Sequence, residues 1–182
     1  TDAFAGINGD FFNISAHKEF PIGAPRGGCA SEGIIQREPR SMEWAFAAID
    51  DNNKPILDNM AFSGSVVSLK APIASYTFND VNLPRTDCYS CDMTFYNEFA
   101  GGYTRMDENA EIGDKLKTEV FFKLADGQAW KINSPITCIV TRIIKDTEGK
   151  NALKPGEAAL SGIDQAKGFL DKLTVGQKLK IN

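Results

Sequence analysis

Short runs in which apolar and polar residues alternate dominate the chain, and this period of two predicts strands. Residues 44–49 alternate large and small apolar side chains, residues 50–55 have a turn composition (Asp-Asp-Asn-Asn-Lys-Pro), and residues 56–62 return to an apolar-rich pattern. This order predicts a β-hairpin. Further strands are expected at 65–69, 74–78 and 93–96.

The second half of the chain predicts another hairpin and a central strand. Residues 118–124 and 128–132 flank an Asp-Gly step at 126–127, which is a strong hairpin-turn signal. Residues 136–144 are rich in β-branched side chains, which favours a central strand. Short strands are also expected at 158–160 and 177–181.

One segment has helical spacing instead. Ser161 is the predicted N-cap, and Asp164 follows three residues later as in a capping box. The apolar residues that repeat with helical spacing are Ile163, Ala166, Phe169, Leu170 and Leu173. These patterns predict one α+β domain over residues 1–182, with a strand-rich mixed or antiparallel sheet, few helices, and one helix near 162–174.

The composition is typical of a globular protein with a sizeable core. The chain has 182 residues, of which 42% are hydrophobic and 24% are charged. Its formal net charge of −4 argues against nucleic acid or an anionic membrane surface as the main partner. No apolar run approaches the roughly 18 residues that a membrane span needs, so no span is predicted.

The four cysteines favour a structural role over a catalytic or metal-binding one. Cys88 and Cys91 have the C-x-x-C spacing of redox and zinc motifs, but Cys29 and Cys138 do not form a second close pair. The single histidine, His17, is isolated in the sequence. We expect structural thiols or one disulfide and no cofactor, with a divalent ion left open.

The segment near the start of the chain is the first candidate site. Asn8-Gly9 predicts a sharp turn that leaves Asn8 and Asp10 at a rim, with Phe11 and Phe12 anchoring the chain behind them. A carboxylate beside an amide over an aromatic floor suits a polyol or a sugar. The alternative is an ordinary hairpin turn, which the Asn-Gly dipeptide alone favours.

Three later segments add candidate polar groups. A glycine-rich run includes Arg26 and Gly28, where exposed N–H groups and a guanidinium suit a phosphate or carboxylate. Arg85 follows a proline in the segment that begins at Asn82, which suits a positioned arginine. Glu111 lies in an acid-rich stretch. The alternatives are a surface loop, a solvated arginine turn and a solvated charged loop.

In their common order these elements resemble the phosphodiester glycosidase domain family, from about residue 5 to residue 178. The matching features are the Ile-Asn-Gly-Asp-Phe-Phe signature at 7–12, the glycine- and proline-rich loop, Asn-x-x-Arg at 82–85, the segment at 101–104 followed by an acid, and Leu-Ser-Gly at 160–162. The signature is the most specific of them. The resemblance implies a location outside the cytoplasm: periplasmic, cell-surface or secreted.

The resemblance also implies hydrolysis of a sugar-1-phosphodiester at the sugar C1–O bond, which releases a free sugar and a phosphomonoester. Such cleavage needs acid and base groups, and the phosphate leaving group needs its charge neutralised. The implied catalytic residues are Asp10, Glu111 and Arg85, with Arg85 clamping the phosphate. The implied substrate-binding residues are Asn8, Gly9, Phe12, Arg26, Gly28 and Asn82.

Family members continue past the Leu-Ser-Gly helix to another arginine-bearing segment and a late Asp-Gly-Gly-Gly-Ser-type motif, neither of which occurs before Asn182. They also carry more sheet before the signature. We therefore expect a C-terminally incomplete domain with little glycosidase activity by itself. Two other functions stay open: a non-catalytic carbohydrate-binding or surface glycan-assembly module, and a purely structural domain. The expected partner is a glycan or sugar-phosphate, with no nucleic acid.

Overall fold

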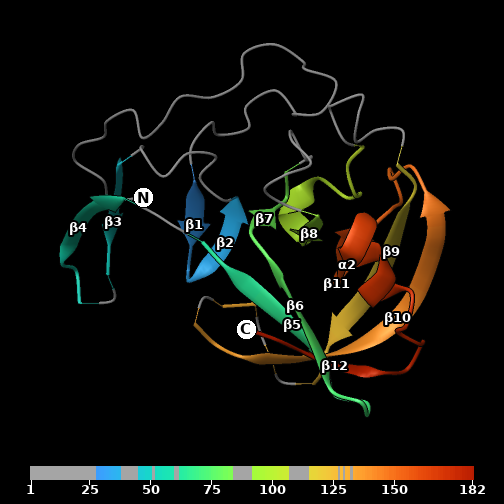
Figure 1. Ribbon diagram of the computed structural model, residues 1–182. Coiled ribbons are helices and arrows are strands. Elements are labelled where there is room, and N and C mark those ends of the chain that lie inside the picture. The colour runs from blue at the N-terminus through green and yellow to red at the C-terminus, as the bar shows by residue number, and fades with distance from the viewer. Residues whose placement is uncertain are drawn as a thin grey trace.

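The computed structural model describes residues 28–37, 45–50, 52–59, 62–83, 92–106, 115–126, 128, 130, 131 and 133–182. Strands dominate this part of the chain, and eight of them form a nearly closed, barrel-like sheet (Figure 1). The prediction of an α+β class is therefore wrong, because the described helical segments are one short α-helix and one 3-10 turn. The fold is mostly β.

The strands of the eight-stranded sheet are β5 (Gly64–Ser68), β6 (Ala74–Phe78), β7 (Asp80–Val81), β8 (Met93–Tyr96), β9 (Lys117–Leu124), β10 (Ile136–Thr147), β11 (Glu157–Gly162) and β12 (Lys178–Ile181). Two small hairpins precede it: β1 (Cys29–Ser31) with β2 (Ile34–Arg37), and β3 (Ala45–Ile49) with β4 (Pro55–Asn59). The helical elements are η1 (Glu98–Ala100) and α2 (Asp164–Leu170).

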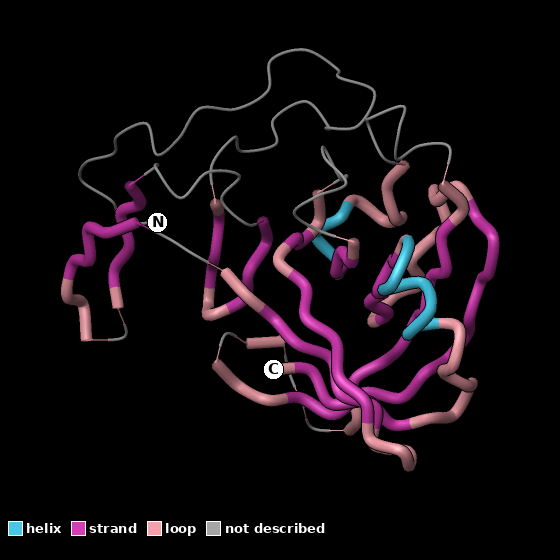
Figure 2. The backbone as a smooth tube through the Cα atoms, in the orientation of Figure 1, coloured by secondary structure: helices cyan, strands magenta, loops and turns pink. Residues whose placement is uncertain are grey.

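The order of strands in the large sheet is β6-β5-β12-β10-β9-β11-β8-β7. All neighbours are antiparallel except β7 and β8, which run parallel. Contacts between β6 and β8 bring the two edge regions of the sheet together, and Figure 2 shows the strands curving round a common interior. Strands far apart in sequence therefore share one core.

The inner face of this sheet carries the main hydrophobic core. Alternate residues of every strand point into it, as the period of two requires. Phe95 lies at its centre, with ring centroids 5.7 Å from Phe78, 6.2 Å from Phe122 and 5.2 Å from Trp130. Helix α2 packs on the same core through Ala166 and other apolar residues. The core therefore joins the helix to both halves of the sheet.

A second, smaller cluster lies on the outer face of β8, β11 and β9. Its buried members are Tyr96, Ala159 and Phe121, which pair across the three strands, together with Ala100 from η1. Ile144 and Leu153 pack against them. The outer face of these strands is thus buried as well, because residues after β8 and β10 fold over it.

The predicted helix near 162–174 is confirmed in position, but it is shorter and its predicted cap is wrong. Ser161 lies inside β11, so it cannot precede the helix. The carboxylate of Asp92 accepts a hydrogen bond from the Ala166 N–H over 3.0 Å and another from the Tyr76 hydroxyl. The cap therefore comes from a residue more than seventy positions earlier.

The predicted hairpins have different outcomes. The hairpin at 44–62 is confirmed as β3 and β4, with Asp50 accepting hydrogen bonds from backbone N–H groups in the turn. The hairpin across 126–127 is wrong: β9 pairs with β10 and β11, and residues 128, 130 and 131 are not in a strand. Trp130 explains the apolar pattern there, because it is buried in the core from a loop.

Strand β10 changes register between Val140 and Arg142. Val140 lies on the inner face and Ile143 packs there too, whereas Arg142 lies over the outer-face ring of Phe121 at 3.4 Å from the centroid. A bulge of one residue therefore switches which residues point outward.

Candidate functional site

Most of the residues that the sequence indicated for the site lie outside the described residues: Asn8, Gly9, Asp10, Phe12, Arg26, Arg85 and Glu111. Cys88 and Cys91 lie outside them as well. The structure describes two members of the predicted site, Gly28 and Asn82. The geometry around these two residues is the starting point for the site.

Asn82 is buried at the end of β7 and forms a reciprocal amide pair with Asn97 at the end of β8. Its Nδ2 donates to Asn97 Oδ1 over 2.6 Å, and its Oδ1 accepts from the Asn97 N–H over 2.9 Å. Its backbone has a φ of 59°, a left-handed conformation that asparagine tolerates better than most residues. Asn82 therefore redirects the chain just before the segment that carries Arg85.

The same pair holds the β1–β2 hairpin against the sheet. Asn82 Nδ2 also donates to the Gln36 carbonyl over 2.8 Å, and Asn97 Nδ2 donates to the Ile35 carbonyl over 3.0 Å. Cys29, which follows Gly28, donates its thiol to the Gln36 side chain over 3.5 Å. Asn82 and Cys29, the residue after Gly28, therefore share Gln36 of β2 as a partner. We call this meeting point the asparagine junction.

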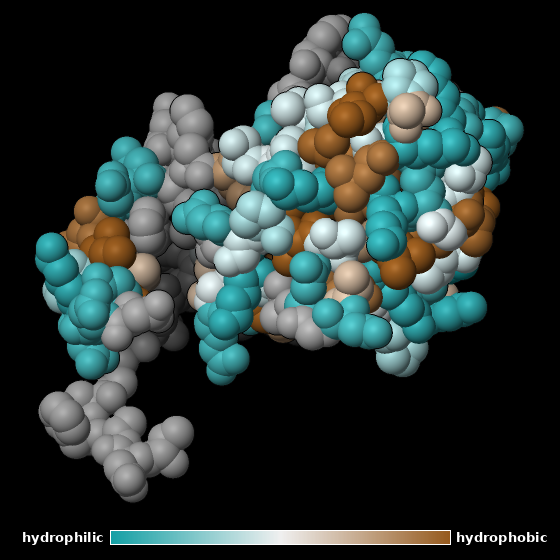
Figure 3. Space-filling model, turned by 90° about the horizontal axis from the view of Figure 1, so that it is seen from below, coloured by the Kyte–Doolittle hydropathy of each residue, from teal (hydrophilic) through white to brown (hydrophobic). Residues whose placement is uncertain are grey.

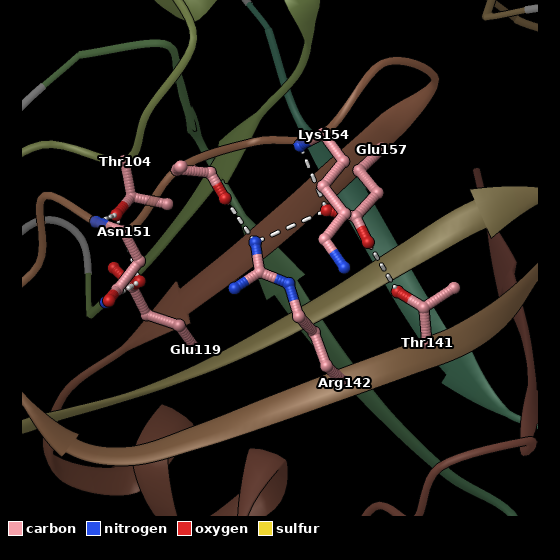
Figure 4. Close-up of polar contacts among 8 residues, drawn as sticks. Thr104, Glu119, Thr141, Arg142, Asn151, Lys154 and Glu157 are labelled. Atoms are coloured by element: carbon pink, nitrogen blue, oxygen red, sulfur yellow. Dashed lines mark hydrogen bonds and ion pairs between the residues drawn. The ribbon is translucent and has the colours of Figure 1, made fainter.

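A row of buried polar side chains crosses the outer face beside the junction. Thr94, Ser161 and Glu119 pair across β8, β11 and β9, and all three are fully buried. The Glu119 carboxylate accepts hydrogen bonds from the Thr104 hydroxyl over 2.9 Å and from Asn151 Nδ2 over 2.8 Å (Figure 4). This acid thus fastens two loop segments to the sheet.

Burial raises the pKa of Glu119 above its ordinary value, because desolvation penalises the charged form. The hydrogen bonds from Asn151 and Thr104 and the charge of Lys117 act in the opposite direction. Lys117 is itself buried and donates to the Arg105 carbonyl over 3.2 Å. The result is a carboxyl group that resists ionisation in the folded protein.

A second buried acid on β11 has the opposite character. Burial alone would raise the pKa of Glu157, but hydrogen bonds from the Lys154 N–H and the Thr141 hydroxyl and the charge of Arg142 hold it below its ordinary value. Arg142 Nη2 lies 3.3 Å from Glu157 Oε2 and also donates to the Ala152 carbonyl (Figure 4). Glu157 is thus ionised, and the guanidinium of Arg142 offsets its charge.

These two acids are too enclosed to act on a solute in this conformation, because Glu119 is fully buried and Glu157 is 2% exposed. Their partners are loop and strand groups of the protein itself. Across the described ranges, no cluster of three or more His, Cys, Asp or Glu side chains could hold a metal ion. The buried polar side chains around Glu119 and Glu157 therefore hold loops in place. Within the described ranges they form no metal site.

Of the described cysteines, Cys138 belongs to the core and Cys29 to the junction. Desolvation raises the pKa of the Cys138 thiol to about 12, so it is an inert structural thiol. Neither helical element in the described part of the chain has the length and apolar character needed to cross a bilayer.

Sequence reasoning missed Asn97, Glu119 and Arg142. Glu119 carried a usable signal, since it is an acid inside the otherwise apolar run that becomes β9. Arg142 carried the same kind of signal, as a charged residue inside the β-branched run that becomes β10, whereas Asn97 follows a strand and carried none.

No protein-family model and no curated protein matches the chain. Two solved structures share its fold. One, from a Burkholderia pseudomallei K96243 protein inferred to be exported, is 16% identical with a TM-score of 0.63, and the match covers 96% of this chain and 36% of that one. The other, a hypothetical protein from Synechocystis, is 15% identical with a TM-score of 0.60, with 96% and 27% covered. The chain thus spans between about a quarter and just over a third of these proteins' length, and the likeness establishes a common fold.

Proposed function

We propose that the chain contributes to a site that hydrolyses a sugar-1-phosphodiester, or a phosphate-decorated glycan, at the sugar C1–O bond. Water adds to C1 and the phosphate oxygen departs, which yields a free sugar and a phosphomonoester. Asp10 or Glu111 serves as the acid or base, and Arg85 neutralises charge on the leaving phosphate. Asn8 binds a sugar hydroxyl.

The asparagine junction is the observation that carries this proposal. Gly28 lies two residues after Arg26, and Leu83 lies two residues before Arg85. The residues next to them, Cys29 and Asn82, both donate to Gln36 of β2. The two arginine-bearing segments thus adjoin residues that share one partner, which supports joint binding of one phosphate group. The ordered motifs of the sequence add to this support.

The proposal includes a location outside the cytoplasm, in the periplasm, on the cell surface or in the medium. One protein of the same fold is inferred to be exported. A phosphate-decorated cell-surface glycan would be available as a substrate there.

The test is release of reducing sugar from sugar-1-phosphodiesters by the full-length protein, alongside its Asp10→Asn and Arg85→Ala variants. Loss of activity of about 100-fold or more in each is expected from removal of an acid or a charge clamp. Asp58→Asn, on an exposed strand of the β3–β4 hairpin, is the matched control and should retain activity. Near-normal turnover in either site variant removes that residue's role. Saturable binding of a sugar phosphate without turnover would instead identify a carbohydrate-binding module.

A further inference from the structure

Lysines and exposed aliphatic residues form one row across the outward face of β5, β12, β10 and β9. The Leu69 N–H donates to the Lys178 carbonyl over 3.2 Å, Lys178 pairs with Ile139, and Ile139 pairs with Lys123. Leu69 is 46% exposed and Ile139 is 38% exposed, and both lysines are exposed. Apolar and cationic side chains therefore alternate along this row.

The turn between β5 and β6 extends the row. Ile73 is 74% exposed there, and Lys70 is exposed in the same turn. A hydrogen bond of 2.7 Å from Gln177 Nε2 to Ser68 Oγ ties the base of this turn to the chain entering β12. We call the set the lysine–aliphatic face: Leu69, Ile73, Lys123, Ile139, Lys178 and Lys180.

Figure 1 shows β12 and the β5–β6 turn at the lower end of the molecule. Figure 3, seen from that end, shows a strip of apolar residues bordered by hydrophilic ones. Leu69 and Ile73 lie on the two sides of the β5–β6 turn, and Ile139 lies beyond Lys178 in the same row. Exposed apolar side chains that lie this close together favour a contact surface.

The local charge of this face differs from that of the whole chain. Residues 64–73, 136–140 and 178–181 contain no Asp or Glu, although the chain carries a net charge of −4. Lys178 and Lys180 therefore have no acidic residue within these segments, whereas Lys123 on β9 pairs with Glu157, whose charge Arg142 offsets. The negative net charge of the whole chain therefore does not argue against an anionic partner at the lysine–aliphatic face.

We propose that the lysine–aliphatic face docks the protein on the surface of an anionic lipid bilayer. Lysine ammonium groups reach the lipid phosphates while Leu69, Ile73 and Ile139 enter the boundary between headgroups and acyl chains. A soluble polyanion would use the lysines but would leave these aliphatic groups in water. The exposed aliphatic groups therefore favour a bilayer. This docking is independent of the hydrolytic function proposed above.

The test is cosedimentation of the full chain with phosphatidylcholine vesicles that contain or lack phosphatidylglycerol. Binding is expected only with phosphatidylglycerol, and it should weaken as salt is added. Lys178→Gln with Lys180→Gln should weaken it about 30-fold, from the usual contribution of each surface lysine. Leu69→Gln with Ile73→Gln should weaken it about tenfold.

Matched controls come from the β3–β4 hairpin, where Ile49 and Leu57 are 74% and 80% exposed. Ile49→Gln with Leu57→Gln, and Lys54→Gln, should leave vesicle binding within about twofold of the parent. Thermal melts establish that every variant is folded. Absence of binding to anionic vesicles overturns the proposal, as does binding that both substituted pairs retain. Binding to polyphosphate that needs the lysines, with vesicle binding indifferent to the aliphatic pair, would show a polyanion site instead.

Discussion

The inner and outer faces of β9 are both buried, yet one holds Val120 and Phe122 while the other holds Lys117, Glu119 and Phe121. The inner face is stabilised by apolar contact, which is non-directional and tolerates several side chains of similar volume. The outer face depends on hydrogen bonds such as those from Thr104 and Asn151 to Glu119, because a buried polar group that loses its partner is costly. The inner face of this strand should therefore tolerate exchange for other apolar side chains, whereas the outer face should not tolerate loss of a hydrogen-bonding partner.

The polar side chains of the outer face also hold loops and a hairpin against the sheet. Glu119 holds segments at Thr104 and Asn151, and the asparagine junction holds the β1–β2 hairpin. Gly28 and Asn82, the described residues of the proposed site, belong to this junction or adjoin it in sequence. We therefore expect the inner core to contribute most of the stability, and the outer polar layer to fix where the loops and the β1–β2 hairpin lie.

The largest expected effect is on the inner face. Phe95→Ala removes a ring that contacts Phe78, Phe122 and Trp130, so we expect a loss of about 3–5 kcal/mol in unfolding free energy. Urea denaturation measures it. Phe99→Ala is the control, because Phe99 is 44% exposed on η1 and should cost less than about 1 kcal/mol. Equal losses in the two variants would mean that the inner core does not dominate stability.

A substitution at the asparagine junction tests whether the buried polar side chains contribute to the unfolding free energy on a scale comparable to the inner core. Asn97→Ala deletes the partners of Asn82 and of the Ile35 carbonyl, so we expect a loss of about 2–4 kcal/mol by urea denaturation. Asn59→Ala, on the exposed β4, should change stability by less than about 0.5 kcal/mol. A small effect at Asn97 would show that the junction is dispensable and would weaken the comparison.

Asp92 tests a polar group at the margin of the inner core. Asp92→Ala removes the acceptor for the Ala166 N–H and the Tyr76 hydroxyl, so we expect a loss of about 1–2 kcal/mol and earlier melting of α2. Hydrogen exchange at the first turn of α2 reports this melting directly. Unchanged protection there would show that the helix is held by packing alone.

The smallest effect is a change in pH dependence. Because the pKa of Glu119 is raised in the folded chain, the folded state retains a proton that the unfolded state loses. Its contribution to stability therefore falls as pH rises above the ordinary value of 4.5. Glu119→Gln cannot ionise, so its stability relative to the parent should increase with pH. Denaturation midpoints at several pH values measure this trend, and a flat or opposite trend would contradict the raised pKa.

Most of the strands could be predicted from the sequence, but their partners could not. Strand-like patterns located β5, β6 and β9, and a β-branched run located β10, since these patterns are local properties of the sequence. Pairing is decided by distant residues, so the Asp-Gly step at 126–127 suggested a partner that the core does not use. Trp130 reaches that core from a loop, and its apolar character mimicked a strand.

The site shows the same division between local and distant information. Asn82 was indicated by its place in a motif, and its left-handed backbone agrees with a turn at that position. Asn97 was not indicated, because its carbonyl partner on Ile35 is 62 positions away. The cap of α2 was misassigned for a similar reason: Ser161 fits a capping box locally, but β11 extends through it to Gly162. Only the folded sheet brings these groups together.

The register change in β10 limits where residues can be inserted into this strand or deleted from it. If β10 alternated regularly from Val140 onward, without the bulge, the guanidinium of Arg142 would face the barrel interior and Ile143 would face outward. Away from the bulge, insertion or deletion of one residue would exchange the inner and outer faces of the residues that follow, so we expect such changes to be poorly tolerated in this strand. The turn at 148–150 lies just beyond it and does not set which face a core residue occupies. Changes in chain length between related proteins of this fold should accordingly collect in that turn.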